Sequence, residues 1–266
     1  MKKIEINAGN YSLEGRLYGL TDKSNPRPAL IFFCGWNPGR IAWTFSDIYA
    51  GLCAKKFNFI CLTAALRGMG SKGDINRLTR SDFLDDVAMV YDFIADYEGV
   101  DKERISVVGE SFGAYMACLL SGKRPVKNLI LRVPTDFPDA GFSETPQKKI
   151  VGTLSRDWKM QKHLPEESLA LSAVRKFMNN IFIIASENDR IVPRQTIENY
   201  LAAVSDPKRA GYFLMKNTGH ALINPLKQYG FLKILFEIVN THIQWLIDSN
   251  LLNAQFERGF AFVRLS

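Results

Sequence analysis

The feature that most constrains the fold is the stretch from Arg104 to Leu120, RISVVGESFGAYMACLL. A short apolar run, the motif GESFG and apolar residues at helical spacing indicate a strand, a tight turn and a helix. A serine at the apex of such a turn adopts strained backbone geometry, and Gly109 and Gly113 leave space for the neighbouring strand and helix. The free N–H groups and positive dipole end of that helix favour an oxyanion beside Ser111. We therefore interpret Ser111 as a nucleophile, and an ordinary turn between a strand and a helix is the alternative.

This strand, turn and helix resemble the nucleophile turn of the α/β-hydrolase family. The stretch Leu66–Gly73, LRGMGSKG, is similar to a segment of many dienelactone-hydrolase-like and serine-peptidase-like members, including the prolyl-oligopeptidase type, where it shapes the floor near the site. Within the family, the chain as a whole resembles the dienelactone-hydrolase and serine-esterase-like branch. That similarity gives Arg67 a supporting role. The resemblance implies an α/β fold with a doubly wound, mainly parallel sheet of about eight strands and a small helical lid. It also implies a triad in the order nucleophile, acid, histidine, with the last two on loops after later strands.

The expected acid follows the apolar run Ile181–Ala185, which is typical of a buried strand. This run leads into SENDRIVP, and the family frequently has an aspartate here, followed by an aliphatic pair and a proline. Asp189 fits that pattern. Glu187, which is nearer the end of the strand, and a purely structural loop acid are the alternatives.

The chain has three histidines, and His220 is the one in the expected position. It follows the strand Gly211–Met215 in a Gly-His loop, after Asp189 in the chain, whereas His163 and His242 lie in the expected lid and the terminal helix. A serine hydroxyl is a weak nucleophile near neutral pH, so an imidazole must accept its proton. We expect His220 to be the general base and Asp189 to fix its tautomer.

The oxyanion would be bound near the end of the apolar strand Ala29–Cys34. The family often has His-Gly here, and in this chain Cys34 replaces the histidine while Gly35 remains. Because the donor is a backbone N–H, the replacement need not abolish the oxyanion hole. We expect the N–H groups of Trp36 and Phe112 to be the donors, and a plain loop with a packed indole is the alternative.

Residues 135–180 break the alternation of strands and helices. In a doubly wound fold such an insertion lies above the carboxyl ends of the strands, and this one is too short to bury a core of its own. We therefore interpret residues 1–266 as a single domain with a lid at 135–180. Phe142 and Trp158 are predicted to line an acyl pocket, although either ring could equally hold the lid in place.

Composition places the chain among ordinary globular proteins, with 266 residues, 47% apolar and 23% charged. No apolar run is long enough to span a membrane, and the N-terminus alternates apolar and polar residues like a strand, unlike a signal peptide. The four cysteines lie in or beside apolar segments without a C-x-x-C pair, which predicts reduced, buried thiols in a cytoplasmic protein, with disulfides or metal as the alternative. Residues 251–266 read as an extra edge strand or an ordered tail.

The net charge of +7 would suit nucleic acid, an acidic partner or an anionic substrate. The basic residues are spread along the chain, which favours a solvated basic surface without nucleic-acid binding. The segment Ser81–Tyr97 carries aspartates at helical spacing and no histidine, so we expect a solvated helix face there and no metal site.

Together these features predict serine-dependent hydrolysis of a carboxylic ester or thioester of a small acyl substrate, through an acyl-enzyme and without a metal or organic cofactor. A serine peptidase of the prolyl-oligopeptidase type is an alternative, which the lack of a propeller domain makes less favourable. Acyl transfer would use the same three residues, and a non-catalytic receptor or scaffold would retain the fold alone. The sequence does not specify acyl length, leaving group or oligomeric state.

Overall fold

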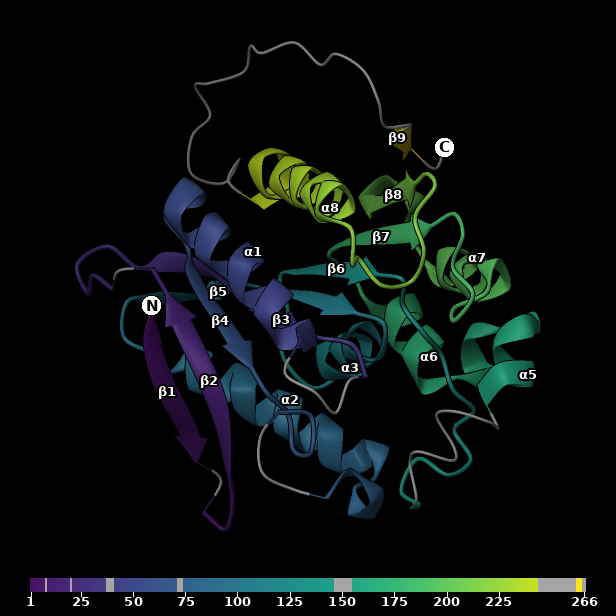
Figure 1. Cartoon of the computed structure of the whole chain (residues 1–266), viewed down its shortest axis with the longest axis horizontal. Coiled ribbons are helices and arrows are strands. Elements are labelled where there is room, and N and C mark those ends of the chain that lie inside the picture. The colour runs from purple at the N-terminus through teal and green to yellow at the C-terminus, as the bar shows by residue number, and fades with distance from the viewer. Residues whose placement is uncertain are drawn as a thin grey trace.

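The computed structural model describes residues 1–7, 9–19, 21–36, 41–70, 74–145, 155–243 and 262–264. In these residues nine strands form one sheet in the order β1-β2-β4-β3-β5-β6-β7-β8-β9 (Figure 1). Neighbouring strands from β4 through β8 run parallel, and β1, β2 and β9 pair antiparallel. The strands are β1 (Lys2–Asn7), β2 (Ser12–Tyr18), β3 (Arg27–Phe33), β4 (Ile60–Ala64), β5 (Val100–Glu110), β6 (Asn128–Arg132), β7 (Asn180–Ser186), β8 (Ala210–Met215) and β9 (Phe262–Arg264).

Helices cover both faces of this sheet, which confirms the predicted doubly wound α/β fold (Figure 1). One face carries α1 (Ile41–Phe57) and α8 (Pro225–Ile238), and the other carries α2 (Arg80–Ala95), α3 (Phe112–Ser121), α6 (Leu169–Lys176) and α7 (Arg194–Ala203). A short helix α5 (Ser155–Met160) precedes α6, three-residue 3-10 turns lie at Ile75–Arg77, Pro165–Glu167 and Pro207–Arg209, and a π-helical turn, Val239–Ile243, follows α8.

The central strands are apolar on both faces because each side packs against a helical layer. In β3, Ile31 and Phe33 belong to the core beneath α2 and α3, whereas Leu30 and Phe32 belong to the core beneath α1 and α8. Such continuous apolar runs are typical of parallel strands buried between two layers. The loops at the carboxyl ends of β3, β5, β7 and β8 therefore meet at one edge of a rigid sheet.

The insertion between β6 and β7 (residues 133–179) is described at 133–145 and 155–179, and residues 146–154 of the predicted lid lie outside the described part. Within the insertion, the turn Pro165–Glu167 and α6 meet at Ser168, whose hydroxyl accepts from the Leu171 N–H at the start of α6. Ala170, Leu171 and Val174 of α6 are buried in the same core as α3. That part of the insertion is therefore tied to the body of the protein.

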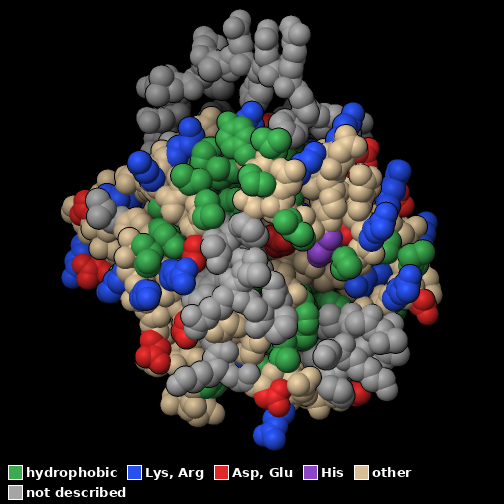
Figure 2. Space-filling view, viewed as in Figure 1, with side chains coloured by type: hydrophobic (Ala, Val, Ile, Leu, Met, Phe, Trp, Pro, Cys, Tyr) green, Lys and Arg blue, Asp and Glu red, His purple; other side chains and the backbone are tan. Residues whose placement is uncertain are grey.

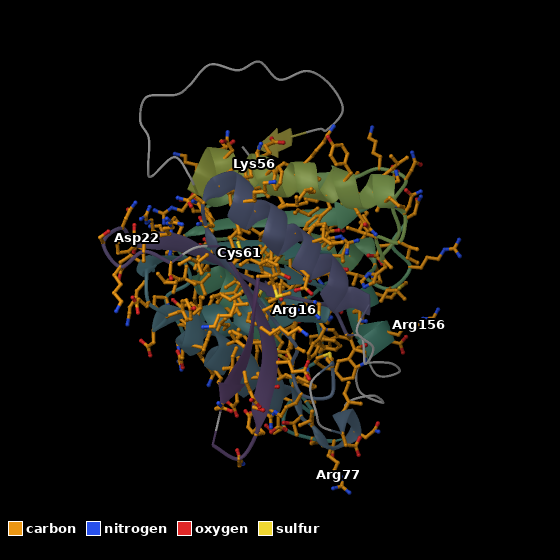
Figure 3. The ribbon with its side chains drawn as sticks, turned by 60° about the vertical axis from the view of Figure 1, so that its left-hand side comes forward. Arg16, Asp22, Lys56, Cys61, Arg77 and Arg156 are labelled. Carbon is orange, nitrogen blue, oxygen red and sulfur yellow. The ribbon has the colours of Figure 1, made fainter. Side chains whose placement is uncertain are left out.

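The four cysteines are free and buried, as the sequence predicts. Burial raises the pKa of the Cys34 and Cys53 thiols to about 12, with the charge of Glu110 adding to the effect at Cys34. Cys61 lies in β4, between β2 and β3 (Figure 3). Thiols in such surroundings are poor nucleophiles because the thiolate is the reactive form.

The expectation of a solvated acidic face on α2 is wrong for Asp86, which is fully buried. Its carboxylate accepts hydrogen bonds from the Arg67 backbone N–H at 2.9 Å and from Arg67 Nε at 2.7 Å. Burial raises the pKa of Asp86 to about 6, although Arg67 acts in the opposite direction. Asp82 forms a capping box with Thr79 at the start of α2, so these two acids have structural roles.

The face of the molecule shown in Figure 2 agrees with a dispersed positive charge. Lysine and arginine side chains lie around the face shown in Figure 2 without forming one block. Among the described residues, no helix combines the length and the apolar character needed to cross a membrane.

Candidate active site

Ser111 lies between the end of β5 and the start of α3, with φ 53° and ψ −112°. Few residues other than glycine adopt a positive φ, and holding one there costs about 1–3 kcal/mol. The two glycines of the motif are required by close packing: a Cβ on Gly109 would lie 2.5 Å from Ala114 Cα, and one on Gly113 would lie 2.3 Å from the Phe33 carbonyl oxygen. The crossing of strand and helix therefore fixes the serine at the edge of the sheet.

The structure brings Ser111, His220 and Asp189 together in one hydrogen-bonded chain. His220 Nε2 lies 3.0 Å from Ser111 Oγ, and His220 Nδ1 lies 2.8 Å from Asp189 Oδ2. The residues are 109 and 31 positions apart in the sequence, so the contact depends on the ends of β5, β7 and β8 lying at one edge of the sheet. The Asp189 side chain is 5% exposed and that of His220 is 21% exposed. This arrangement can move a proton from the hydroxyl to the imidazole.

The loop after β7 holds Asp189 in its ionised form. Its Oδ1 accepts from the N–H groups of Ile191 and Val192, at 2.8 and 2.9 Å, which leaves Oδ2 for His220. Burial alone would raise the pKa of Asp189, but the hydrogen bond and charge of His220, with these two amides, hold it below its usual range.

Glu187, the alternative acid, has a different partner. Its Oε2 accepts from the backbone N–H of Asn217 at 2.7 Å, in the turn that leads toward His220. Glu187 therefore braces the histidine loop, and the imidazole contacts Asp189 instead.

The other two histidines do not enter the hydrogen-bonded chain as far as the structure describes them. His163 is buried and stacks on the Trp158 ring at 3.6 Å, with Nε2 at 2.8 Å from the Trp158 carbonyl oxygen. The side chain of His242 lies outside the described part of the molecule.

The two residues expected to donate to the oxyanion, Trp36 and Phe112, belong to segments that approach Ser111 closely. Phe112 is the first residue of α3, where backbone N–H groups have no acceptor within the helix. The Trp36 ring packs edge-on against the Phe112 ring at 5.0 Å, and a Cβ on Gly35 would lie 3.2 Å from Ser111 Cβ. The end of β3 thus runs directly past the serine, and the donor roles of Trp36 and Phe112 stay predictions.

Arg132, at the end of β6, is a residue that sequence reasoning missed. It is fully buried, with Nη1 at 2.6 Å from Glu110 Oε1 and Nη2 donating to the His220 carbonyl oxygen at 2.5 Å. Its own carbonyl oxygen accepts from the Ser111 N–H at 2.9 Å. Arg132 therefore connects the serine turn to the histidine loop. The signal was a lone arginine ending the apolar run NLILR.

Trp158 and Phe142 have contacts that hold the insertion in place. Trp158 Nε1 donates to Asp136 Oδ2 at 3.1 Å, and the Phe142 carbonyl oxygen accepts from the Ser81 N–H at 3.2 Å. The Phe142 ring also lies 5.6 Å from the guanidinium carbon of the buried Arg80. These contacts favour the structural interpretation, and a role in lining an acyl pocket stays a prediction for both rings.

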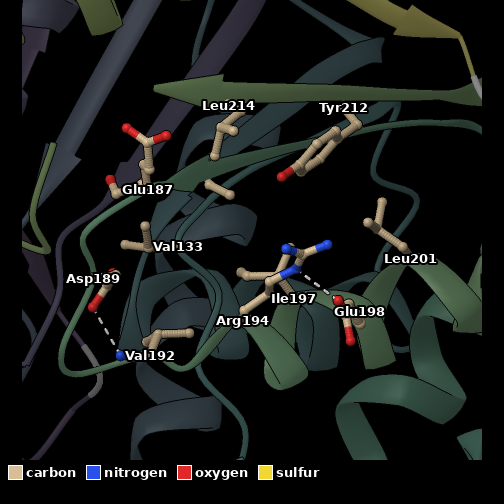
Figure 4. Close-up of a pocket in the computed structure, with 12 residues that line it drawn as sticks. Val133, Glu187, Asp189, Val192, Arg194, Ile197, Glu198, Leu201, Tyr212 and Leu214 are labelled. Atoms are coloured by element: carbon tan, nitrogen blue, oxygen red, sulfur yellow. Dashed lines mark hydrogen bonds and ion pairs between the residues drawn. The ribbon is translucent and has the colours of Figure 1, made fainter. Parts of the chain in front are cut away.

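A cavity of about 430 Å³ lies between α7 and the ends of β7 and β8 (Figure 4). Its walls include Val133, Ile197 and Leu214, the Tyr212 hydroxyl points into it, and the Arg194–Glu198 ion pair lies along it. Asp189 and Val192 contribute one wall, so the cavity borders the loop that holds the acid. No group of three or more His, Cys, Asp and Glu side chains in the described part of the chain is arranged to hold a metal ion.

Solved structures of other proteins confirm the fold class. A thermophilic esterase from Thermogutta terrifontis, solved with propionate bound, has a TM-score of 0.67 at 17% identity and covers 90% of this chain and 93% of its own. Est1E from Butyrivibrio proteoclasticus, solved with ferulic acid, has a TM-score of 0.64 at 16% identity, and the match covers 90% of this chain and 100% of Est1E. A putative dipeptidyl aminopeptidase IV from Bacteroides ovatus has a TM-score of 0.65 at 19% identity. The match covers 88% of this chain and 35% of the Bacteroides chain. The chain has the α/β-hydrolase fold.

The family is shown by sequence. The model of the prolyl oligopeptidase family matches residues 43–237, well over half of the chain. The chain belongs to the prolyl oligopeptidase family. Uncharacterized proteins from two strains of Mycobacterium tuberculosis are 28% identical over 155 residues, and the match spans 58% of this chain and half the length of those relatives. Family and fold together support a hydrolase.

Proposed function

We propose that the chain is a serine hydrolase in which Ser111 is the nucleophile, His220 the general base and Asp189 the group that orients and stabilises the imidazole. The observation that carries the proposal is the hydrogen-bonded chain from Asp189 through His220 to the Ser111 hydroxyl. The strained conformation of Ser111 supports it, because strain of this kind concentrates at functional sites.

The proposed mechanism follows from these contacts. As Ser111 Oγ attacks a carbonyl carbon, its proton moves to His220 Nε2, and the charge of Asp189 stabilises the imidazolium. The oxyanion accepts from the N–H groups of Phe112 and Trp36. His220 then returns the proton to the leaving group, and a water molecule activated by the same imidazole hydrolyses the acyl-enzyme.

We assign the substrate to the carboxylic esters or thioesters of small acyl groups. Esterases among proteins of the same fold support this class. A serine peptidase is the second candidate, because the matching family is that of prolyl oligopeptidase. Both reactions use the same three residues, so they differ in the leaving group that His220 must protonate.

Labelling with a fluorophosphonate tests the nucleophile. The wild-type protein should form one covalent adduct, and Ser111→Ala should form none. Ser121→Ala is a matched control because Ser121 ends the same helix and donates to the Cys118 carbonyl oxygen at 2.7 Å. An adduct that survives in Ser111→Ala, or a wild-type protein that is never labelled, would contradict the proposal.

Turnover separates the two candidate substrates. We expect Ser111-dependent hydrolysis of p-nitrophenyl esters with short acyl chains to be much faster than hydrolysis of p-nitroanilides of dipeptides ending in proline. Faster cleavage of the anilides would reverse the assignment and make the chain a peptidase.

A further inference from the structure

Lys159 is a buried cation that the proposed mechanism does not use. It lies in α5 of the insertion between β6 and β7, and it is 8% exposed. Its side chain has no hydrogen-bond acceptor, and no carboxylate at ion-pair distance, in the part of the chain that the structure describes. The contact recorded for the ammonium group is with the Phe137 ring, whose centre lies 5.6 Å from Nζ, so its N–H donors have no acceptor among the described residues.

Two aromatic rings connect the ammonium group to the turn that holds Ser111. Lys159 Nζ is 5.6 Å from the centre of the Phe137 ring, and that ring is 6.0 Å from the ring of Phe112, the residue after the serine. The backbone of Lys159 is anchored because its carbonyl oxygen accepts from the Thr196 hydroxyl at 2.9 Å. The backbone of Lys159 is therefore held against α7, and the charge of Asp189 acts on its ammonium group.

The two carboxylates that act electrostatically on this lysine already have donors. The oxygens of Asp136 accept from the Ser168 hydroxyl and Trp158 Nε1, and those of Asp189 accept from His220 and two backbone amides. Burial lowers the pKa of Lys159, and the charges of Asp189 and Asp136 oppose that change. The two carboxylates therefore act on the lysine through their charges, and neither accepts a hydrogen bond from its ammonium group.

We propose, on the basis of the proposed Ser111 hydrolysis, that Lys159 Nζ binds an anionic group of the substrate, so that the preferred substrate is an ester carrying a carboxylate close to the scissile bond. A carboxylate would supply the acceptor that the described residues do not, and a hydrogen bond between two charged groups is about twice as strong as a neutral one. The aromatic ring of Phe137 beside the ammonium group limits the water that would compete for it.

Matched ester pairs test this inference. In the first pair, the p-nitrophenyl monoester of glutaric acid carries a carboxylate on its acyl group, and p-nitrophenyl pentanoate is its neutral partner. In the second pair, m-acetoxybenzoate carries a carboxylate on its leaving group, and phenyl acetate is its neutral partner. In Lys159→Met, kcat/KM for at least one anionic ester should fall about 10- to 100-fold, while its neutral partner changes less than about threefold.

Two further variants separate recognition from a general effect of charge or folding. Arg156→Met removes a positive charge from the same helix, but Arg156 is exposed and points away from the molecule (Figure 3). In this variant kcat/KM should stay unchanged for both esters of each pair. Lys159→Arg should restore part of the preference for the anionic ester. Equal losses for both esters in Lys159→Met would overturn the inference, and so would an unchanged preference.

The wild-type protein provides a measurement that does not depend on folding of a variant. If it hydrolyses each neutral ester at least about tenfold faster than its anionic partner, Lys159 does not recognise the charge. Ser111→Ala distinguishes this failure from failure of the proposed function. Ser111-dependent hydrolysis without charge selectivity refutes the role of Lys159 alone, whereas hydrolysis that does not depend on Ser111 refutes the proposed function.

Discussion

The positive φ of Ser111 gives a prediction about stability that does not depend on the substrate. Replacing Ser111 by glycine removes the Cβ that makes this conformation unfavourable, whereas replacing it by alanine keeps the Cβ. Both variants lose the hydrogen bond between the hydroxyl and His220, so that loss cancels in the comparison. The difference in stability between the two variants therefore reports the backbone strain.

The expected magnitude follows from two opposing terms. Relief of the strain should stabilise the glycine variant by about 1–3 kcal/mol. The greater freedom of glycine in the unfolded chain should cost about 0.5–1 kcal/mol. We therefore expect Ser111→Gly to be more stable than Ser111→Ala by about 1 kcal/mol, which urea denaturation would show as a midpoint higher by about 0.3–1 M.

Ser172 provides the matched control, because it lies within α6 and its N–H donates to the Ser168 carbonyl oxygen at 2.8 Å. In a right-handed helix alanine is the more stable of the two replacements, so Ser172→Gly should be less stable than Ser172→Ala by about 0.5–1 kcal/mol. If glycine is the less stable choice at both positions, the strain at Ser111 is not energetically significant and this reasoning is refuted.

Two further predictions concern the residues around the serine. In Asp189→Asn, the asparagine cannot stabilise the imidazolium of His220, so kcat should fall roughly 10³- to 10⁴-fold. Because the pKa of Asp189 is held low, its stabilising effect is present above the ordinary carboxyl pKa and is lost as pH falls. The wild-type advantage in unfolding free energy over the variant should thus shrink below about pH 4, and a constant advantage down to pH 2 would contradict this. Gly113→Ala should destabilise by about 3 kcal/mol or more and impair turnover, because its Cβ would meet the Phe33 carbonyl oxygen at 2.3 Å. Gly122→Ala, where the nearest contact is 3.4 Å, should be nearly neutral in the same denaturation assay.

The strands could be predicted from the sequence because both of their faces are buried. Runs such as Ala29–Cys34 and Ile181–Ala185 contain no polar residue, and they correspond to β3 and β7 within two residues at each end. The turn at Ser111 was equally clear, since the spacing of its glycines reflects a contact between adjacent elements. The arrangement of Ser111, Asp189 and His220 at one edge follows once the strand order is known.

The features that sequence reasoning missed depend on partners that are distant in the chain. Asp86 looked like one more acid on an exposed helix face, and its burial is explained by Arg67, which precedes α2. The burial of Arg132 depends on Glu110 and on the carbonyl of His220. A charged residue has the same appearance in a sequence whether water or a distant partner surrounds it, so local patterns favour the more common, exposed interpretation.

The helix α5 was missed for a different reason. Its six residues carry no apolar stripe at helical spacing, and its Trp158 and Lys159 are held by contacts with Asp136 and Thr196. Short helices of this kind are fixed by tertiary contacts more than by intrinsic propensity.

The order of the three site residues along the chain has a consequence for synthesis on the ribosome. The strand that precedes Ser111 lies at the centre of the sheet, whereas His220 follows Ser111 by 109 residues, after the outermost parallel strand has been translated. If Ser111 and His220 act as proposed, a nascent polypeptide therefore holds the nucleophile without its base until nearly all of the parallel sheet can assemble. Premature termination anywhere before β8 would yield inert fragments, and newly made molecules would acquire reactivity late and in a single step.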